Sequence, residues 1–133
     1  QASRVNVERM RANAIEAAEQ CGILTIPDCR EPLKLDAALA AYLPHGPMIF
    51  CDEREDSESP VATLARLPKG PLSLLIGPEG GFSVEERTRL HAETNVTAIS
   101  LGPRILRADS AAVAALAVAQ EVAPAAAPLD RAC

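Results

Sequence analysis

An apolar run that stops abruptly at a group of glycines constrains this chain more than any other stretch. Leu72–Ile76 is followed by Gly77-Pro78-Glu79-Gly80-Gly81, and Ser83 with Glu86 three residues later forms the pattern of a helix capping box. This order predicts a strand, a tight turn and the N-terminus of a helix. In α/β proteins such a turn can hold a small polar ligand against backbone N–H groups. A plain structural turn has the same glycine spacing, so spacing alone leaves both interpretations open.

A second turn of the same kind follows another apolar run. Thr97–Leu101 is expected to be a strand, and Gly102-Pro103 begins a loop that continues as Arg104-Ile105-Leu106-Arg107. Parallel strands end at one edge of a sheet, where ligands bind, so we expect the two turns to form one pocket. Arginines just before a helix do not stabilise it, because its dipole is positive there. They indicate either an anion site or ion pairs with Glu79 or Asp109.

Helical and strand patterns alternate along the chain. We expect helices at Val7–Gln20, Leu35–Tyr42, Val61–Leu67, Ser83 to about Glu93 and Ala111 to about Val122, and strands at Ile23–Ile26, Met48–Cys51, Leu72–Ile76 and Thr97–Leu101. This alternation predicts an α/β fold with a parallel sheet covered by helices on both faces. Asn6 and Gly22 should cap the first helix, and Asp109 or Ser110 should cap the last.

Expected burial differs sharply along the chain. The last helix contains almost only Ala, Val and Leu, which predicts burial in a core or at a subunit interface. The segment Asp52–Ser59 is acidic and polar, and we expect it to be a solvated loop with nothing to bury. Residues 1–123 are expected to form one domain, and residues 124–133 a flexible tail.

Charge and cysteine content limit the classes of function. The net charge of −5 disfavours a free-standing RNA or DNA binder, since phosphate contacts supply most of that affinity. The four cysteines (Cys21, Cys29, Cys51 and Cys133) form no CxxC pair and have no histidine at ligand spacing. No zinc site is therefore expected, and free cytosolic thiols are favoured over disulfides. No apolar stretch approaches the roughly 20 residues of a membrane span.

The glycine turns do not match the common nucleotide-binding motifs. Gly77–Gly81 lacks both the Gly-Lys-Ser/Thr ending of a P-loop and the G-x-G-x-x-G of a dinucleotide-binding fold. His45 is expected in a loop and His91 on a helix surface, without a neighbouring nucleophile, so a hydrolase triad is disfavoured. A flavodoxin-like enzyme that binds a phosphate or a nucleotide is an alternative, although such a fold has no need of the second motif.

Both motifs resemble those of one known family. LLIGPEGGFSVEE at residues 74–86 and LGPRILRADSA at residues 101–111, together with the helix end EAAEQCG at residues 16–22, closely resemble the RsmE family of ribosomal RNA methyltransferases in the SPOUT class. The resemblance extends from Asn6 to about Gln120. It implies a parallel α/β fold with a deep C-terminal trefoil knot. It also implies an enzyme that uses S-adenosylmethionine to methylate N3 of a uridine in small-subunit (16S) ribosomal RNA.

The resemblance implies partners and a location as well. The family acts as a homodimer in the cytoplasm, with each site near the subunit boundary, and it requires no membrane and no metal ion. It also carries a small N-terminal PUA-like domain that binds RNA. Residues 1–133 contain no counterpart of that domain, so we expect it in the full-length protein, where it would compensate for the acidic charge of this part.

Individual residues receive roles from the resemblance. The cofactor is held by backbone groups of three loops, which correspond here to Leu75, Ile76, Gly77, Gly80, Leu101, Gly102, Ile105 and Leu106. The catalytic residues are expected to be Arg107, Glu79 and Asp109. Arg107 would contact the target RNA or stabilise negative charge on the uracil ring, and Arg104 would contact an RNA phosphate. Asp109 could cap the last helix, serve the site, or both, and Glu79 could be structural, cofactor-facing or substrate-facing.

One position departs from the pattern of the family. Relatives commonly have arginine where this chain has Ile23, and isoleucine cannot hold an RNA phosphate or a substrate carbonyl. Either a neighbouring arginine substitutes for it, or RNA handling is weakened. The second case would leave a non-catalytic knotted dimer that binds the cofactor without docking RNA productively, and this is the alternative function.

Overall fold

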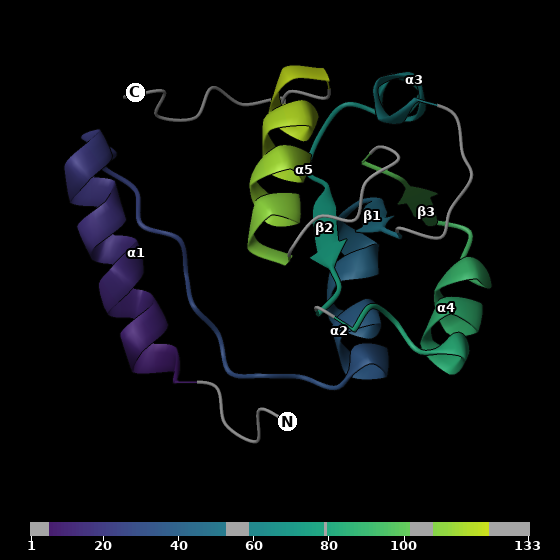
Figure 1. Ribbon diagram of the computed structural model, residues 1–133, viewed down its shortest axis with the longest axis horizontal. Helices are drawn as coiled ribbons and strands as arrows, with labels where there is room; N and C mark the ends of the chain where they lie inside the picture. Colours follow the sequence, from purple (N-terminus) through teal and green to yellow (C-terminus); the bar gives the residue numbers. More distant parts are fainter. Residues whose placement is uncertain (1–5, 53–58, 79, 102–107, 123–133) are drawn as a thin grey trace. The chain divides into compact units, whose positions relative to one another are not determined.

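The computed structural model describes residues 6–52, 59–78, 80–101 and 108–122 (Figure 1). The chain divides into two compact units. The first comprises residues 1–34 and 128–133, and the second comprises residues 35–127. The first unit contains a single long helix among its described residues, and the second contains the sheet with its covering helices, so each is taken by itself below.

The helix of the first unit, α1 (Val7–Cys21), has both of its predicted caps. The side chain of Asn6 accepts a hydrogen bond from the backbone N–H of Arg9 at 2.9 Å. At the other end Gly22 has φ 67°, in the left-handed region that favours glycine. Its backbone N–H bonds back to the carbonyl of Glu19. Local sequence signals therefore fix both ends of this helix.

The strand predicted at Ile23–Ile26 is wrong, because the structure has irregular backbone there. The backbone N–H of Ile23 donates to the carbonyl of Ala18 at 2.9 Å, which completes the helix end in a Schellman arrangement. Leu24 is 85% exposed. A four-residue apolar run forms a strand only where a neighbour pairs with it, and this one has no ladder partner among the described residues.

The second unit is built on a parallel sheet, as predicted, with three of the four predicted strands among the described residues. Strands β1 (Met48–Cys51), β2 (Ser73–Ile76) and β3 (Val96–Ile99) lie in the order β2-β1-β3. The central strand β1 pairs on both edges, and its first three residues are buried. This explains why Met48–Cys51 is apolar throughout, since both faces of a central parallel strand are covered.

Helices cover both faces of this sheet, which confirms the predicted layering. On one face α2 (Leu35–Tyr42), the short 3₁₀ helix η1 (Leu43–His45) and α4 (Val84–His91) pack over a core centred on Phe50, Leu39 and Leu90. On the other face α3 (Pro60–Ala65) and α5 (Ala108–Val122) pack over Ile49, Leu64 and Ile99. Alternate residues of β1 thus serve opposite cores.

The last helix, α5, departs from its prediction at its start. It begins at Ala108, so Asp109 and Ser110 lie in its first turn and the predicted caps at these residues are wrong. The side chain of Asp109 instead accepts a hydrogen bond from the neighbouring N–H of Ser110 at 2.8 Å, and a carboxylate in a first turn complements the helix dipole. Within this chain one face of α5 is buried, through Ala111, Ala115 and Ala119, while Val113 is 71% and Leu116 50% exposed. Burial of the other face at a subunit interface stays a prediction.

Candidate functional site

The three strands end level with one another at the carboxyl edge of the sheet. Cys51 is in register with Ile76 on one side and with Ile99 on the other. The chain therefore leaves this edge at Asp52, Gly77 and Ser100. Neighbouring strands are about 4.8 Å apart, so the ends of β2 and β3 lie about 10 Å from each other with β1 between them. The structure places the first predicted turn and the end of the strand that precedes the second one at the same edge, with Asp52 between them. The second turn itself, from Gly102, lies outside the described residues.

The first glycine turn needs glycine for two separate reasons. A Cβ atom at Gly77 would lie 3.0 Å from the ring of Phe82, which is tighter than ordinary packing allows. Gly81 has φ 74°, and its N–H donates to the carbonyl of Pro78 at 2.8 Å, which closes the turn. Gly80 is different, because a Cβ there would meet nothing within 4 Å. Its exposed backbone leaves room for a ligand.

A complete capping box fixes the exit from this turn into α4. The backbone N–H of Ser83 donates to the Glu86 carboxylate at 2.9 Å, and the N–H of Glu86 donates to the Ser83 hydroxyl at 3.1 Å. The adjacent Phe82 ring packs edge-on against Phe50, with centroids 5.7 Å apart. The predicted strand, turn and helix start are thus confirmed, and the turn rests on the core.

Only part of the predicted site falls on described residues. Leu75 and Ile76 end β2 and are half-buried, and Gly77 and Gly80 lie in the turn. Leu101 follows β3 and packs against the core beneath α5. Asp109 is exposed in the first turn of α5. The remaining predicted residues lie outside the described residues: Glu79, Gly102, Arg104, Ile105, Leu106 and Arg107.

Sequence reasoning missed a buried ion pair at the same edge. Asp52, expected to begin a solvated loop, is only 4% exposed, so that expectation is wrong for this residue. Its carboxylate accepts a hydrogen bond from Nε of Arg87 at 2.7 Å, and Nε2 of His91 lies 4.0 Å from the same oxygen. Arg87 and His91 are one helical turn apart on α4 and share a face. An available signal was the position of Asp52, directly after a buried parallel strand.

The thiol nearest this edge is not a nucleophile. Burial of Cys51, the last residue of β1, raises the pKa of its thiol to about 11, so it is protonated at neutral pH. Cys29 and Cys51 are free thiols. Within the described ranges, no group of three or more His, Cys, Asp or Glu side chains could hold a metal ion. In the same ranges, no helix is both long and apolar enough to cross a bilayer.

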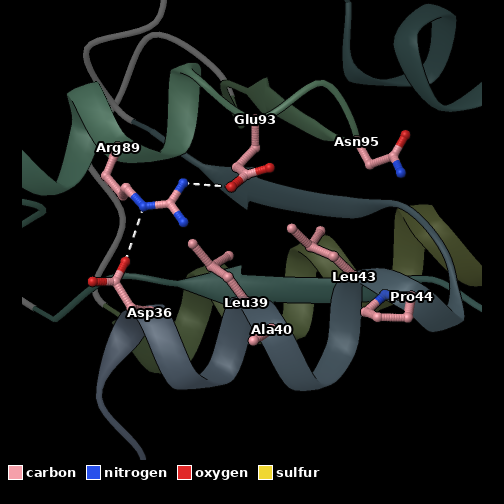
Figure 2. A pocket seen from close by; sticks show the side chains of 8 residues that line it. All are labelled: Asp36, Leu39, Ala40, Leu43, Pro44, Arg89, Glu93 and Asn95. Atoms are coloured by element: carbon pink, nitrogen blue, oxygen red, sulfur yellow. Dashed lines mark hydrogen bonds and ion pairs between the residues drawn. The ribbon is translucent and has the colours of Figure 1, made fainter.

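A pocket of about 410 Å³ lies elsewhere, between α2 and α4 (Figure 2). It is lined by Asp36, Leu39, Ala40, Leu43, Pro44, Arg89, Glu93 and Asn95. Asn95 directly precedes β3, and its carbonyl accepts the N–H of Met48 at 2.9 Å, which places this pocket toward the amino ends of the strands. None of the predicted cofactor residues that the structure describes lines it.

Ion pairs occupy one side of this pocket. Figure 2 shows Arg89 of α4 reaching both Glu93, two residues beyond the end of that helix, and Asp36 on α2, the latter at 2.9 Å from Nε. Hydrogen bonds to Glu93 and then to Asp36 raise the pKa of the Arg89 guanidinium. Because two carboxylates already satisfy this arginine, the pocket offers little free positive charge to an anionic ligand.

Comparison with known proteins assigns the chain to a family. The family model described as an RNA methyltransferase domain matches residues 1–120. The chain belongs to the RNA methyltransferase domain family. Ribosomal RNA small subunit methyltransferase E of Rickettsia conorii is 34% identical over 114 residues, covering 85% of this chain and 46% of the relative. The enzyme of the same name from Bacillus subtilis is 32% identical over 114 residues, covering 82% of this chain and 44% of the relative.

Solved structures agree with this family and with the fold. Ribosomal RNA small subunit methyltransferase E of Neisseria gonorrhoeae, bound to S-adenosylmethionine, matches with a TM-score of 0.74 at 26% identity over 91% of this chain and 51% of that chain. A Legionella pneumophila protein in complex with the same cofactor matches with a TM-score of 0.69 at 35% identity, over 90% and 50% of the two chains. The chain spans about half the length of these relatives.

Proposed function

We propose that this chain is the catalytic part of an S-adenosylmethionine-dependent methyltransferase that methylates N3 of a uridine in 16S ribosomal RNA. The observation that carries the proposal is the Gly77–Ser83 turn at the carboxyl edge of a parallel sheet, in a chain whose relatives include methyltransferases solved with this cofactor. A flavodoxin-like enzyme has no comparable support, because the family match extends over both glycine motifs.

The described part of the site fits an adenosyl ligand. The exposed backbone at Gly80 has open space around it, and the capping box and the Phe82–Phe50 contact hold the turn rigid. Backbone groups of Leu75, Ile76, Gly77, Gly80, Leu101, Gly102, Ile105 and Leu106 would hold the cofactor. A rigid turn lowers the entropy cost of binding, so part of the affinity comes from the fold itself.

The reaction depends mainly on how the protein positions the uracil against the methyl group. S-adenosylmethionine, when bound, supplies a methyl group on a sulfonium that leaves readily. The protein must hold the uracil with N3 in line with that methyl group, and it must assist loss of the N3 proton. We assign to Arg107 the stabilisation of negative charge on the uracil ring, and to Arg104 a phosphate contact. Glu79 and Asp109 are the carboxylates available to orient the substrate.

Larger-scale features belong to the same proposal. We infer a deep trefoil knot formed by the segment around residues 102–107, which would bring the second turn against the first. We also infer a homodimer, supported by the exposed Val113 and Leu116 on the outer face of α5. A PUA-like RNA-binding domain outside residues 1–133 would provide the positive charge that this acidic part lacks, and the enzyme would work in the cytoplasm.

Calorimetry with S-adenosylmethionine tests the cofactor assignment. The chain should bind one cofactor per protomer with a dissociation constant in the micromolar range. A Gly80→Trp variant places a large ring over the open backbone. It should show no heat of cofactor binding while retaining the circular dichroism spectrum of the wild type. Absence of binding by the folded wild-type chain at millimolar cofactor would reject the assignment.

A further inference from the structure

Asp52 is held in place from two sides at the carboxyl edge of the sheet. Its backbone N–H donates to the carbonyl of Ile99 at 2.9 Å, which continues the ladder between β1 and β3 beyond the strand itself. Its carboxylate is buried and receives the guanidinium of Arg87 at 2.7 Å. Isolated buried carboxylates are strongly disfavoured, so this residue depends on its partners on α4.

Through Arg87, the ion pair connects Asp52 to the first turn of α4. It follows directly on Glu86, the third residue of the helix and half of the capping box with Ser83. The helix is only eight residues long, so its N-terminal turns move with whatever anchors them. The Arg87–Asp52 pair therefore ties the end of the glycine turn to the end of β1.

An aromatic path joins the same two places through the core. The Phe82 ring lies directly against Gly77, where an added Cβ would be 3.0 Å away. Phe82 packs edge-on against Phe50, and Phe50 packs edge-on against His91 with centroids 5.2 Å apart. Nε2 of His91 in turn lies 4.0 Å from an oxygen of the Asp52 carboxylate. The turn is thus supported by an aromatic contact beneath it and an ionic contact beside it, both of which converge on Asp52.

We propose that Asp52 is a positioning residue for the cofactor turn, acting through Arg87 and His91 on α4 to hold residues 77–83 in the geometry that receives S-adenosylmethionine. This inference rests on the proposed function and names a residue outside both glycine motifs. Displacements of about 1 Å at a binding turn can cost up to about a hundredfold in function, so a modest loosening has a measurable effect.

Variants that each break one ion pair made by an arginine of α4 test the proposal. Asp52→Asn and Arg87→Gln each remove one partner of the edge pair. Asp36→Asn removes a partner of Arg89, two residues along α4, which faces the pocket instead. Calorimetry at 15 °C should show cofactor affinity weakened at least about tenfold by either edge variant and changed less than about twofold by Asp36→Asn. The double variant should be no weaker than the worse single variant, because both break one link.

Hydrogen exchange in the cofactor-free protein gives a second readout. The peptide covering residues 77–83 should exchange faster in Asp52→Asn than in wild type, while peptides from α2 should not change. Asp52→Glu, which keeps the charge, should recover part of both effects. If Asp52→Asn does not fold, Arg87→Gln, whose side chain is more exposed, carries the same comparison.

The outcomes separate this inference from the proposed function. A folded edge variant with wild-type affinity and wild-type exchange at residues 77–83 would overturn the positioning role while leaving the function intact. An equal loss in Asp36→Asn would also overturn it, since the effect would then be a general loosening of α4. Failure of the wild-type chain to bind the cofactor would reject the proposed function instead.

Discussion

A Cβ atom on Gly77 would lie 3.0 Å from Cε2 of Phe82, so the residue that follows β2 and the residue that precedes the capping box of α4 are fitted to each other. Phe82 cannot move away freely, because its ring is packed edge-on against the fully buried Phe50. The turn between them is therefore closed against the core at Phe82 and open to solvent at Pro78 and Gly80.

Gly77→Ala should destabilise the second unit. The new methyl group must displace a packed ring, and overpacking of this kind costs about 1–3 kcal/mol of unfolding free energy. Urea denaturation followed by circular dichroism measures the change. Gly70→Ala is an unsuitable control because its φ is 134°, whereas Gly80→Ala adds the same methyl in open space. A Gly77→Ala variant as stable as wild type would show that Phe82 adapts without cost.

Gly80→Ala should separate binding from stability. The methyl group meets no protein atom within 4 Å, so the unfolding free energy should change by less than about 0.5 kcal/mol. The same methyl stands where the cofactor is proposed to approach the backbone, so affinity for S-adenosylmethionine should fall by about tenfold, or about 1.4 kcal/mol. Calorimetry and urea denaturation on one preparation give both numbers. Unchanged affinity would place the cofactor away from Gly80.

Ser83→Ala should remove half of the capping box. The hydroxyl accepts the N–H of Glu86 at 3.1 Å, and loss of an N-cap costs about 1 kcal/mol. The matched control is Val84→Ala, at the next residue, whose side chain is exposed. It should change the free energy of unfolding by less than about 0.5 kcal/mol. Equal midpoints in urea for Ser83→Ala and wild type would mean that water replaces the hydroxyl without loss.

Structural features that depend on one segment were predicted well, and features that depend on contacts between distant segments were not. The Ser83–Glu86 box, the cap at Asn6 and the strand Met48–Cys51 all follow from residues that are near neighbours in the sequence, and all are present. The four-residue run Ile23–Ile26 has similar apolar character but gains no ladder partner in the fold. An apolar run becomes a strand only if a distant segment pairs with it. The run itself does not show whether such a partner exists.

The candidate site shows the same division. Spacing and resemblance were enough to select Gly77, Gly80 and Leu75, because a tight turn after a buried strand is recognisable from neighbouring residues in the sequence. The position of Asp52 directly after a buried strand marks it as a candidate, but its burial depends on Arg87, which is 35 residues away in the sequence, and this could not be predicted. Beside the acidic residues that follow it, Asp52 has the composition of a solvated loop. Only the packing of α4 against the sheet reveals its partner.

Stability at alkaline pH should depend on Cys51. Its pKa is raised by burial from an ordinary value of 9.0 to about 11, so the folded state keeps a proton that the unfolded chain loses. The sign follows directly: the thiol does not affect stability below pH 9, and stability falls as pH rises from 9 to 11. Comparing urea midpoints of Cys51→Ala and wild type over this range isolates the effect. A constant difference between the two proteins would contradict it.

The pocket between α2 and α4 should be irrelevant to the cofactor. Ala40→Trp places a large ring in the cavity of about 410 Å³, and Ala40 is exposed on α2, so the fold should tolerate it. Affinity for S-adenosylmethionine, measured by calorimetry, should stay within about twofold of wild type, a difference of about 0.4 kcal/mol. A loss of binding in a variant with wild-type stability would move the cofactor site to this pocket.

The most direct test of the central claim is methyl transfer to RNA. The protein, with whatever sequence flanks residues 1–133, is incubated with labelled S-adenosylmethionine and small ribosomal subunits that lack the modification, and the RNA is digested to nucleosides. Label should appear in N3-methyluridine, and Arg107→Ala should reduce its rate by at least about a hundredfold, as loss of a charge-stabilising group does. Cofactor binding without any label in uridine N3 would contradict the claim.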